Sequence, residues 1–336
     1  GLGDVYKRQA LVPLLAGDQA LGVLALDNRQ ARLLDDDEVR FLRLIANQAA
    51  LAIEQVRLHQ ETLQQQQVEA ELDMGRQIQL SLLPRSCPTP PGWECAAIYL
   101  PARQVGGDFY DFFNLRDAEL HPAKLDERAP SEPSASPEGP RRLGIVIADV
   151  TDKGVPAALF MALSRTMIRT TALSGRRPAA ALARANDLIR KDSRSGLFVS
   201  TFYGVLEPGT GHLVYANGGH TPPLWLQAAT GQVSELEGRG IVLGILPGVE
   251  SEEREIVLAP GDLLVLYTDG VTEATDTQGR MFGEERLHDM IAGLGSATAQ
   301  EVIAAILDAV RSFAGRAPQS DDLTLVVLRR LASDPT

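Results

Sequence analysis

Aspartates at the ends of apolar segments constrain the fold of this chain more than any other feature of its sequence. Asp149 ends the apolar run LGIVIADV, and Asp269 follows the run DLLVLYT. Asp321 and Asp322 come directly before LTLVVL, and Asp108 lies in VGGDFYD, before a further apolar stretch. Short apolar runs of this kind predict buried strands. Each aspartate is therefore expected at the edge of a sheet.

Several carboxylates at one sheet edge repel one another. A divalent cation between them relieves that repulsion, and hard oxygen ligands favour Mg²⁺ or Mn²⁺ over zinc. The sequence therefore predicts a metal site built from carboxylates and water.

Each of these motifs also has a simpler interpretation. Asp269 with Gly270 is typical of a turn, Asp321 suits the polar start of a strand, and Asp149 suits a helix cap. Gly106 suits a tight bend. Because four such motifs each adjoin an apolar segment, we favour the metal site over four separate coincidences.

The charge balance and the cysteine count exclude several classes of protein. Lys and Arg number 32 against 44 Asp and Glu, so the formal net charge of the 336 residues is −12, which argues against nucleic acid as a partner. Two cysteines cannot build a disulfide framework or a four-cysteine zinc site. No run reaches the ~20 apolar residues that cross a bilayer. The chain begins with Gly and lacks a signal segment, so we expect a cytoplasmic protein whose N-terminal part is missing here.

The patterns downstream of residue 95 are typical of an α+β fold. We expect strands within 95–116, at 143–150 and 323–328, and six short strands between residues 200 and 268. Amphipathic helices are expected at 155–173, 178–191, 284–292 and 299–314. Residues 117–142 hold five prolines and many charges without periodicity, which predicts a mobile loop inserted between two strands.

Residues 10–34 predict a hairpin turning at Gly17 and Asp18, and one long helix is expected over 36–83. Apolar residues recur in this helix at the three-and-four spacing of a coiled-coil seam: Leu42, Ile45, Ala49, Ala52, Val56, His59 and Leu63. One interpretation is a surface helix packed on its own domain. We favour the other, in which residues 42–63 pair with a second copy in a homodimer.

The motifs together resemble the PPM-type metal-dependent protein serine/threonine phosphatases, in the SpoIIE-like branch that regulates sigma factors. The resemblance covers residues 70–332 and rests on IQLSLLP (78–84), VGGDFYDFF (105–113), IADVTDKGVPAALFMA (147–162), FYGVL and YANGGHTPPL (202–224), LAPGDLLVLYTDGVTEA (258–274) and SDDLTLVVL (320–328). It implies a central β-sandwich flanked by helix pairs over residues 84–332. It also implies two divalent ions, Mn²⁺ or Mg²⁺, that activate a water molecule to attack phosphorus.

The resemblance assigns roles to individual positions. It implies that Asp149 bridges the two ions and that Val150 offers its carbonyl to one of them. Asp269 and Asp321 match ligands of the second ion, and Asp108 matches an acid at the metal centre.

A separate loop is implied to bind substrate, through Asn217, Gly218 and His220. For His220 the alternatives are leaving-group protonation, phosphate contact, or a plain loop histidine. The chain departs from many relatives in having Asp152 where they have glycine, and Gly-Gly-His-Thr where they have Ala-Gly-His-Asn.

Residues 1–35 and the start of the long helix resemble the C-terminal part of a GAF sensory domain, through LVPLL, LGVLALDN and VRFLRLIANQAALAIEQ. The two resemblances imply a sensor-controlled phosphatase that acts on phosphoserine or phosphothreonine of a regulatory protein, of the anti-sigma-factor antagonist kind. The first alternative is a non-catalytic adaptor that keeps the fold without the metal. A remote alternative is a diguanylate cyclase, suggested only by the run from Gly106 to Phe109.

Overall fold

The computed structural model describes residues 9–27, 34–115, 142–193 and 196–332. The chain divides into two compact units, residues 1–74 and 75–336, and the division falls inside the long helix α1 (Asp36–Leu82). Among the described residues no helix is long and apolar enough to cross a membrane. Of the loop predicted at 117–142, only Arg142 lies within the described residues.

Two five-stranded antiparallel sheets form the second unit. The first sheet has the strand order β10-β7-β6-β5-β4, and the second has the order β3-β12-β11-β8-β9. The bounds are β3 Trp93–Leu100, β4 Phe109–Leu115, β5 Arg142–Val150, β6 Val199–Glu207, β7 His212–Gly218, β8 Leu224–Gln227, β9 Gln232–Glu235, β10 Glu253–Val257, β11 Leu263–Tyr267 and β12 Leu323–Arg330.

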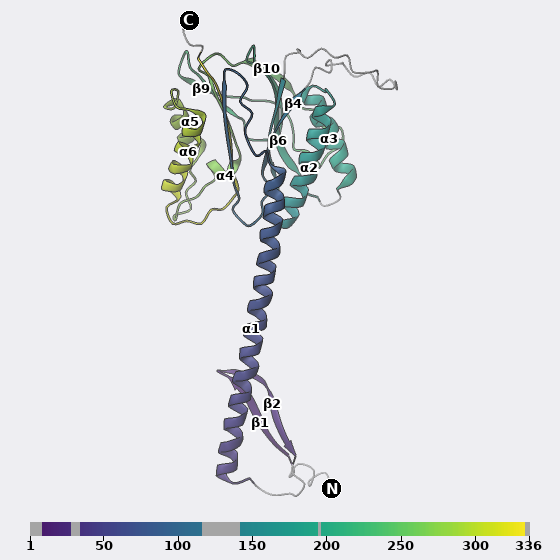
Figure 1. Ribbon diagram of the computed structural model, residues 1–336, viewed down its shortest axis with the longest axis vertical. Helices are drawn as coiled ribbons and strands as arrows, with labels where there is room; N and C mark the ends of the chain where they lie inside the picture. Colours follow the sequence, from purple (N-terminus) through teal and green to yellow (C-terminus); the bar gives the residue numbers. More distant parts are fainter. Residues whose placement is uncertain (1–8, 28–33, 116–141, 194–195, 333–336) are drawn as a thin grey trace. The chain divides into compact units, whose positions relative to one another are not determined.

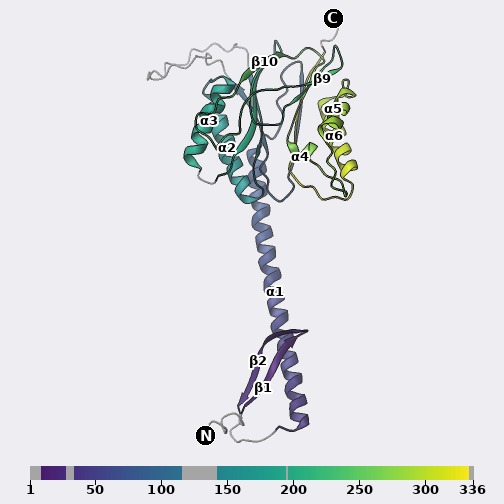
Figure 2. The same cartoon turned by 180° about the vertical axis from the view of Figure 1, so that it is seen from behind.

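A helix pair covers the outer face of each sheet (Figures 1 and 2). The helices α2 (Val155–Leu173) and α3 (Pro178–Asp192) pack on the first sheet, and α5 (Glu284–Ala292) and α6 (Ala299–Ala314) pack on the second. A single turn, α4 (Asp269–Thr272), follows β11. The predicted α+β sandwich flanked by helix pairs is confirmed.

Strand β11 shows why these segments are apolar on both faces. Leu264 and Leu266 belong to the core between the two sheets. Leu263, Val265 and Tyr267 belong to a second core beneath α5 and α6. A strand with a sheet on one side and helices on the other has no solvent-facing positions, so polar residues are confined to its ends.

The first unit contains a hairpin beside the N-terminal half of α1. The strands β1 (Gln9–Ala16) and β2 (Gln19–Asp27) pair antiparallel around the predicted turn at Gly17. Leu42, Ala46 and Ala50 of α1 are buried. Their spacing of four residues places them on one face of the helix. The hairpin and the uninterrupted helix are both confirmed.

Candidate active site

Asp108 and Asp149 come from neighbouring strands of the first sheet. Asp149 lies at the end of β5, and Asp108 comes directly before Phe109 of β4, which pairs with Ala148. The antiparallel register therefore places both acids at one end of the sheet, where each carboxyl group influences the pKa of the other.

The second sheet contributes Asp269 and Asp321 at the same end of the sandwich. Asp269 follows β11 and Asp321 precedes β12, and these two strands pair antiparallel. Their two segments approach so closely that a Cβ on Gly270 would lie 1.9 Å from the Asp322 carbonyl oxygen. Any other residue at position 270 would push them apart, so this glycine is required by the close approach.

Burial and mutual repulsion make these carboxylates hard to ionise. Burial raises the pKa of Asp149 to about 7, and Asp269, Asp321 and Asp322 add to that shift. Burial also raises the pKa of Asp108 well above its usual value, with Asp149 and Asp322 contributing. The pKa of Asp269 is raised by burial, by Glu273 and by Asp321. A positive charge at this end of the sandwich would relieve all three shifts.

Two threonines hold Asp108 in place, and the sequence reasoning missed both. The Asp108 Oδ2 accepts hydrogen bonds from Thr268 Oγ1 at 2.7 Å and Thr324 Oγ1 at 2.6 Å. Because Asp108 adjoins the first sheet while Thr268 follows β11 and Thr324 belongs to β12 of the second, these bonds tie the two sheets together. Thr268 directly precedes Asp269, and Thr324 lies two residues after Asp322. This closeness to the acids is the one feature of the sequence that could have indicated a role for the threonines in the site.

Asp322 holds the glycine loop in front of Asp108, a role that the sequence did not reveal. Its Oδ1 accepts from the backbone nitrogen of Ala102 at 2.8 Å, and its Oδ2 accepts from Gly107 at 2.8 Å. A Cβ on Gly106 would lie 1.7 Å from Asp322 Oδ2. Gly106 and Gly107 therefore do more than form a bend: they allow the Asp322 carboxylate to approach the backbone of the loop.

A lysine lies beside one of the predicted metal ligands. Lys153 Nζ is 2.8 Å from Asp321 Oδ2 and donates to the Ser320 carbonyl at 2.6 Å. Its neighbour Asp152 has φ of +76°, the left-handed region that favours glycine. Asp152 Oδ1 accepts from the Lys153 backbone nitrogen at 2.8 Å. Glycine adopts this conformation without strain, so an aspartate at position 152 has a backbone cost that glycine would not have.

The predicted substrate loop lies at the same end of the first sheet, but no contact is described between it and the four acids. Asn217 is buried and binds the backbone of His220 with both ends of its amide, at 2.7 and 2.9 Å. His220 Nδ1 lies 2.8 Å from Ser200 Oγ, and Ser200 pairs with Asp149 across the strands. Burial lowers the pKa of His220 to about 4. Its imidazole is therefore neutral at pH 7, and a contact of Asn217, Gly218 or His220 with substrate stays a prediction.

The acidic end of the sandwich offers oxygen donors to a metal ion. Among the described residues, no three Asp, Glu, His or Cys side chains lie close enough together to enclose an ion. The donors are nevertheless oxygen atoms of buried acids whose ionisation is suppressed, at strand ends that the hydrogen bonds fix. This chemistry suits Mg²⁺ or Mn²⁺, so the residues fit the ions although no cage is formed by their present side-chain positions.

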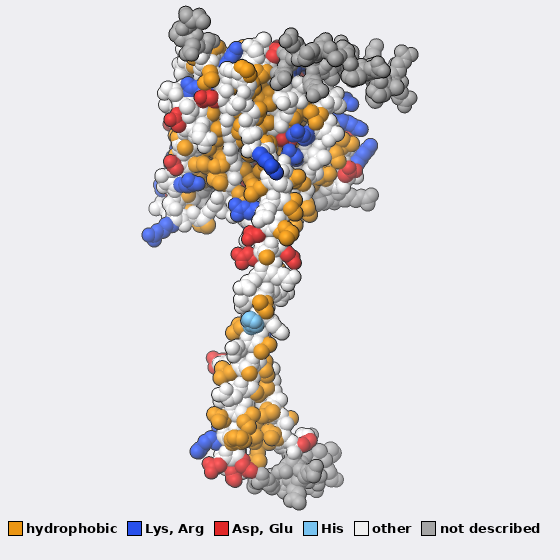
Figure 3. Space-filling view, viewed as in Figure 1, with side chains coloured by type: hydrophobic (Ala, Val, Ile, Leu, Met, Phe, Trp, Pro, Cys, Tyr) orange, Lys and Arg blue, Asp and Glu red, His pale blue; other side chains and the backbone are white. Residues whose placement is uncertain are grey.

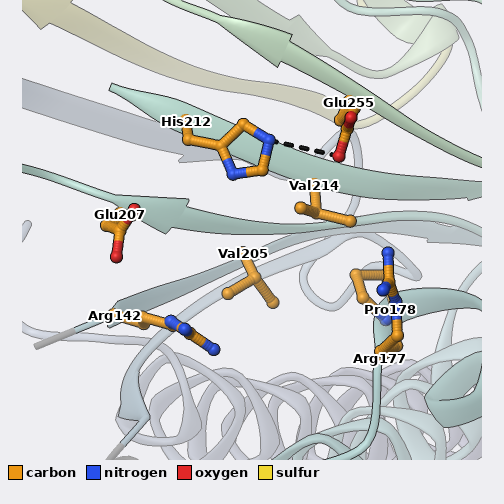
Figure 4. Close-up of a pocket in the computed structure, with 8 residues that line it drawn as sticks. All are labelled: Arg142, Arg177, Pro178, Val205, Glu207, His212, Val214 and Glu255. Carbon is orange, nitrogen blue, oxygen red and sulfur yellow. Dashed lines mark hydrogen bonds and ion pairs between the residues drawn. The ribbon is translucent and has the colours of Figure 1, made fainter. Parts of the chain in front are cut away.

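A separate cavity of about 170 Å³ lies at the opposite end of the first sheet (Figure 4). Two of its basic groups are already paired, His212 with Glu255 at 3.2 Å and Arg177 with Glu253. Arg142 also lines it, and makes no ion pair with the described residues. None of the predicted site residues lines this cavity.

Comparisons with known proteins agree with this geometry. Residues 139–331 match the family described as Stage II sporulation protein E, and residues 6–55 match a GAF domain family. The chain is 28% identical over 266 residues to the phosphoserine phosphatase RsbU of Bacillus subtilis, covering 79% of this chain and 72% of RsbU. It is 30% identical over 287 residues to the protein IcfG of Synechocystis, covering 77% of this chain but only 41% of IcfG. Among solved structures, the SiaA-PP2C domain of Pseudomonas aeruginosa superposes with a TM-score of 0.64 at 24% identity, covering 79% of this chain and 98% of that domain.

Proposed function

Because the chain belongs to the SpoIIE family, we propose that it is a metal-dependent phosphatase that hydrolyses phosphoserine or phosphothreonine on a regulatory protein. One observation carries the proposal: four acids from the ends of strands in two sheets lie at one end of the sandwich, and three of them have raised pKa values. The matched family and the name of the relative RsbU, a phosphoserine phosphatase, support the same reaction.

In this proposal the two divalent ions are held by Asp149, Asp269 and Asp321, with the Val150 carbonyl and Asp108 completing the site. When bound, the ions lower the pKa of water and neutralise charge on the phosphoryl oxygens. Thr268 and Thr324 orient the Asp108 carboxyl group, and Asp322 fixes the loop that precedes Asp108. Lys153 is paired with Asp321, the carboxylate that a bound ion would also neutralise.

The direct test is hydrolysis of p-nitrophenyl phosphate with Mn²⁺, without it, and after addition of EDTA. We expect activity only with the metal. Asp149→Asn and Asp269→Asn should each remove at least about 99% of the turnover, since removal of a group that stabilises transition-state charge typically costs 10²-fold or more. Near-wild-type turnover in either variant, with the fold intact, would falsify the metal assignment.

The alternative is a non-catalytic adaptor with a phosphatase fold. One observation favours it: Asp321, a predicted metal ligand, is paired with Lys153. Titration with Mn²⁺ in a calorimeter separates the two functions, because an adaptor gives no binding heat whereas the phosphatase does.

The proposed substrate is a phosphorylated anti-sigma-factor antagonist. The sigma-factor branch of the family resemblance supports this class of substrate, and the acidic net charge of −12 gives no support to nucleic acid as a partner. Incubation of the Mn²⁺-loaded protein with phosphorylated antagonists of this kind, followed by mass spectrometry, tests the assignment.

For control of the enzyme, we propose a three-part organisation: a GAF fragment at 1–35, a connecting helix at 36–83 and the phosphatase domain at 84–332. The match of residues 6–55 to a GAF family supports the sensory part. Ile45, Val56 and Leu63 are 40%, 58% and 51% exposed, and hydrophobic side chains follow this part of α1 in Figure 3. The proposed homodimer buries this seam, which lies on a different face of the helix from the buried residues Leu42, Ala46 and Ala50.

A further inference from the structure

A groove with a volume of about 310 Å³ lies beside the acidic end of the sandwich, and it is separate from the cavity that Arg142 and His212 line. Gly270 and Ser320 line it, and each is one residue away from a predicted metal ligand, Asp269 or Asp321. One such step along the chain is about 3.8 Å between Cα atoms. The groove is therefore built from the same two segments that supply half of the candidate active site.

The charge of this groove is opposite to that of the chain as a whole. Arg76 of α1 and Arg311 of α6 are the ionised side chains among the described residues that line it, and no acid lines it. The rest of the lining is apolar or neutral, with Leu100, Val310 and Leu323 among the apolar walls. In a protein of net charge −12, the described side chains that line this groove thus carry positive charge alone.

Neither guanidinium group makes a strong ion pair within the described chain. Within the described chain, Arg76 makes no hydrogen bond or ion pair, and its charge acts on Tyr99, whose hydroxyl lies 3.4 Å from Asp322 Oδ2. Arg311 lies 3.9 Å from Asp308 of the same helix, and both side chains are more than 60% exposed. Such an exposed pair contributes little and leaves the Arg311 fork able to bind a carboxylate.

The side chain of Gln319 holds the rim of the groove. Gln319 Nε2 donates to the carbonyls of Leu100 and Asp321, at 2.9 and 2.7 Å. These bonds connect the end of β3 to the segment before β12. Gln319 therefore positions both the rim of the groove and the segment that carries Asp321.

We propose that this arginine groove, defined by Arg76 and Arg311, binds an acidic side chain of the phosphoprotein substrate close to the phosphorylated residue. The proposal rests on the proposed phosphatase function and specifies its substrate class: a phosphoserine or phosphothreonine with Asp or Glu a few residues away. Arginine suits this role because its planar fork binds carboxylates through two parallel hydrogen bonds.

The test compares kcat/KM for three phosphoserine peptides with glutamates, alanines or lysines around the phosphoserine, in the presence of Mn²⁺. We expect the wild-type protein to prefer the glutamate peptide over the alanine peptide by about tenfold, or about 1.4 kcal/mol. Arg76→Ala and Arg311→Ala should each lower that ratio at least threefold, and Arg311→Glu should shift the preference toward the lysine peptide. The matched control is Arg142→Ala in the distant cavity, which removes the same charge and should keep the wild-type ratio.

Absence of a preference for the glutamate peptide in the wild-type protein would overturn the proposal. An equal loss of kcat/KM on the glutamate and alanine peptides in both arginine variants would overturn it too. The arginines would then stabilise the fold or the active site without contacting the acidic side chains of the substrate. Fluorescence anisotropy with the labelled glutamate peptide measures binding alone, so it tests the arginine groove independently of the proposed phosphatase function. If no ester is hydrolysed but binding depends on both arginines, the groove is confirmed and the phosphatase function is wrong.

Discussion

Gln79, near the C-terminal end of α1, forms two hydrogen bonds with the backbone of Gly106. Its Nε2 donates to the Gly106 carbonyl at 2.6 Å, and its Oε1 accepts from the Gly106 nitrogen at 3.2 Å. Gln79 is buried, with 4% of its surface exposed. The loop in front of Asp108 is thus held from two sides, by Gln79 of the helix and by Asp322 of the second sheet.

This contact predicts that Gln79→Leu lowers both stability and turnover. The substitution leaves two buried backbone groups of Gly106 without partners, at a cost of about 1–3 kcal/mol each. We expect a lower melting temperature and at least a tenfold loss of kcat on p-nitrophenyl phosphate with Mn²⁺, because the Asp108 loop loses one support. Gln77→Leu, at an exposed position of the same helix, is the control. Wild-type values for Gln79→Leu would show that α1 does not support the site.

The positions of the main acids could be predicted from the sequence, because a strand buried on both faces leaves polar residues only at its ends. Asp108, Asp149, Asp269 and Asp321 follow that rule. The roles of Gln79 and Asp322 could not be predicted in this way. Asp322 binds Gly107 across 215 residues of sequence, and such a contact depends on how two sheets meet rather than on any local pattern.

The long helix shows a second limit of sequence reasoning. Its periodicity predicts one seam, yet Leu42 belongs with Ala46 and Ala50 to the face that is buried within the first unit. Ile45 and Val56 lie on another face and are exposed. A helix that is apolar on several faces packs against more than one neighbour, and periodicity alone does not assign each face to its neighbour.

The raised pKa of Asp149 predicts how the stability of the metal-free protein depends on pH. The folded-state pKa of about 7 lies above the usual value of 3.8, so between these values the folded protein binds more protons than the unfolded chain. The free energy of unfolding should therefore fall as pH rises from about 4 to 7, by about 1.4 kcal/mol per pH unit. Thermal melts in EDTA measure this fall, and Asp149→Asn should flatten it. An equally steep fall in the variant would contradict the assignment to Asp149.

Asp111 predicts a large effect on stability away from the metal centre. It is 1% exposed and pairs with Arg165 at 3.0 Å and Arg169 at 2.8 Å, which ties β4 to α2. Asp111→Ala leaves partly buried arginines without a counter-ion, so unfolding free energy should drop by about 3–5 kcal/mol. Denaturant melts provide the measurement. Asp37→Ala, which removes an exposed ion pair with Arg40, should cost less than about 1 kcal/mol. Equal losses in the two variants would argue against a buried ion pair.

The exposed seam of α1 predicts a parallel homodimer. Ile45→Glu and Val56→Glu each bury a charge if the seam is an interface, at a cost of several kcal/mol, so both should convert dimers to monomers in sedimentation at micromolar concentration. Asn47→Asp, at an exposed position on the opposite face of the helix, is the control. One residue inserted near Gln66 should turn the downstream helix by about 100° and change activity. A monomeric wild-type protein whose activity ignores the insertion would remove the signalling role of this helix.

The ion pair between Lys153 and Asp321 predicts a gain in metal affinity when the lysine is removed. The ammonium group lies 2.8 Å from the Asp321 carboxylate and also favours the charged form of Asp269. It therefore neutralises the same carboxylates that a metal ion would bind, and it repels that ion. Lys153→Met should tighten Mn²⁺ binding by about 3–10-fold in calorimetry, or about 0.6–1.4 kcal/mol.

The same variant should melt at a lower temperature than the wild type in EDTA, because the repulsion among the acids is then unopposed. It should regain that loss when Mn²⁺ is added. Lys191→Met, at an exposed position near the end of α3, is expected to change neither value. If Lys153→Met binds Mn²⁺ no more tightly than the control does, then Asp321 is not a metal ligand, and Lys153 serves only to stabilise the segment before β12.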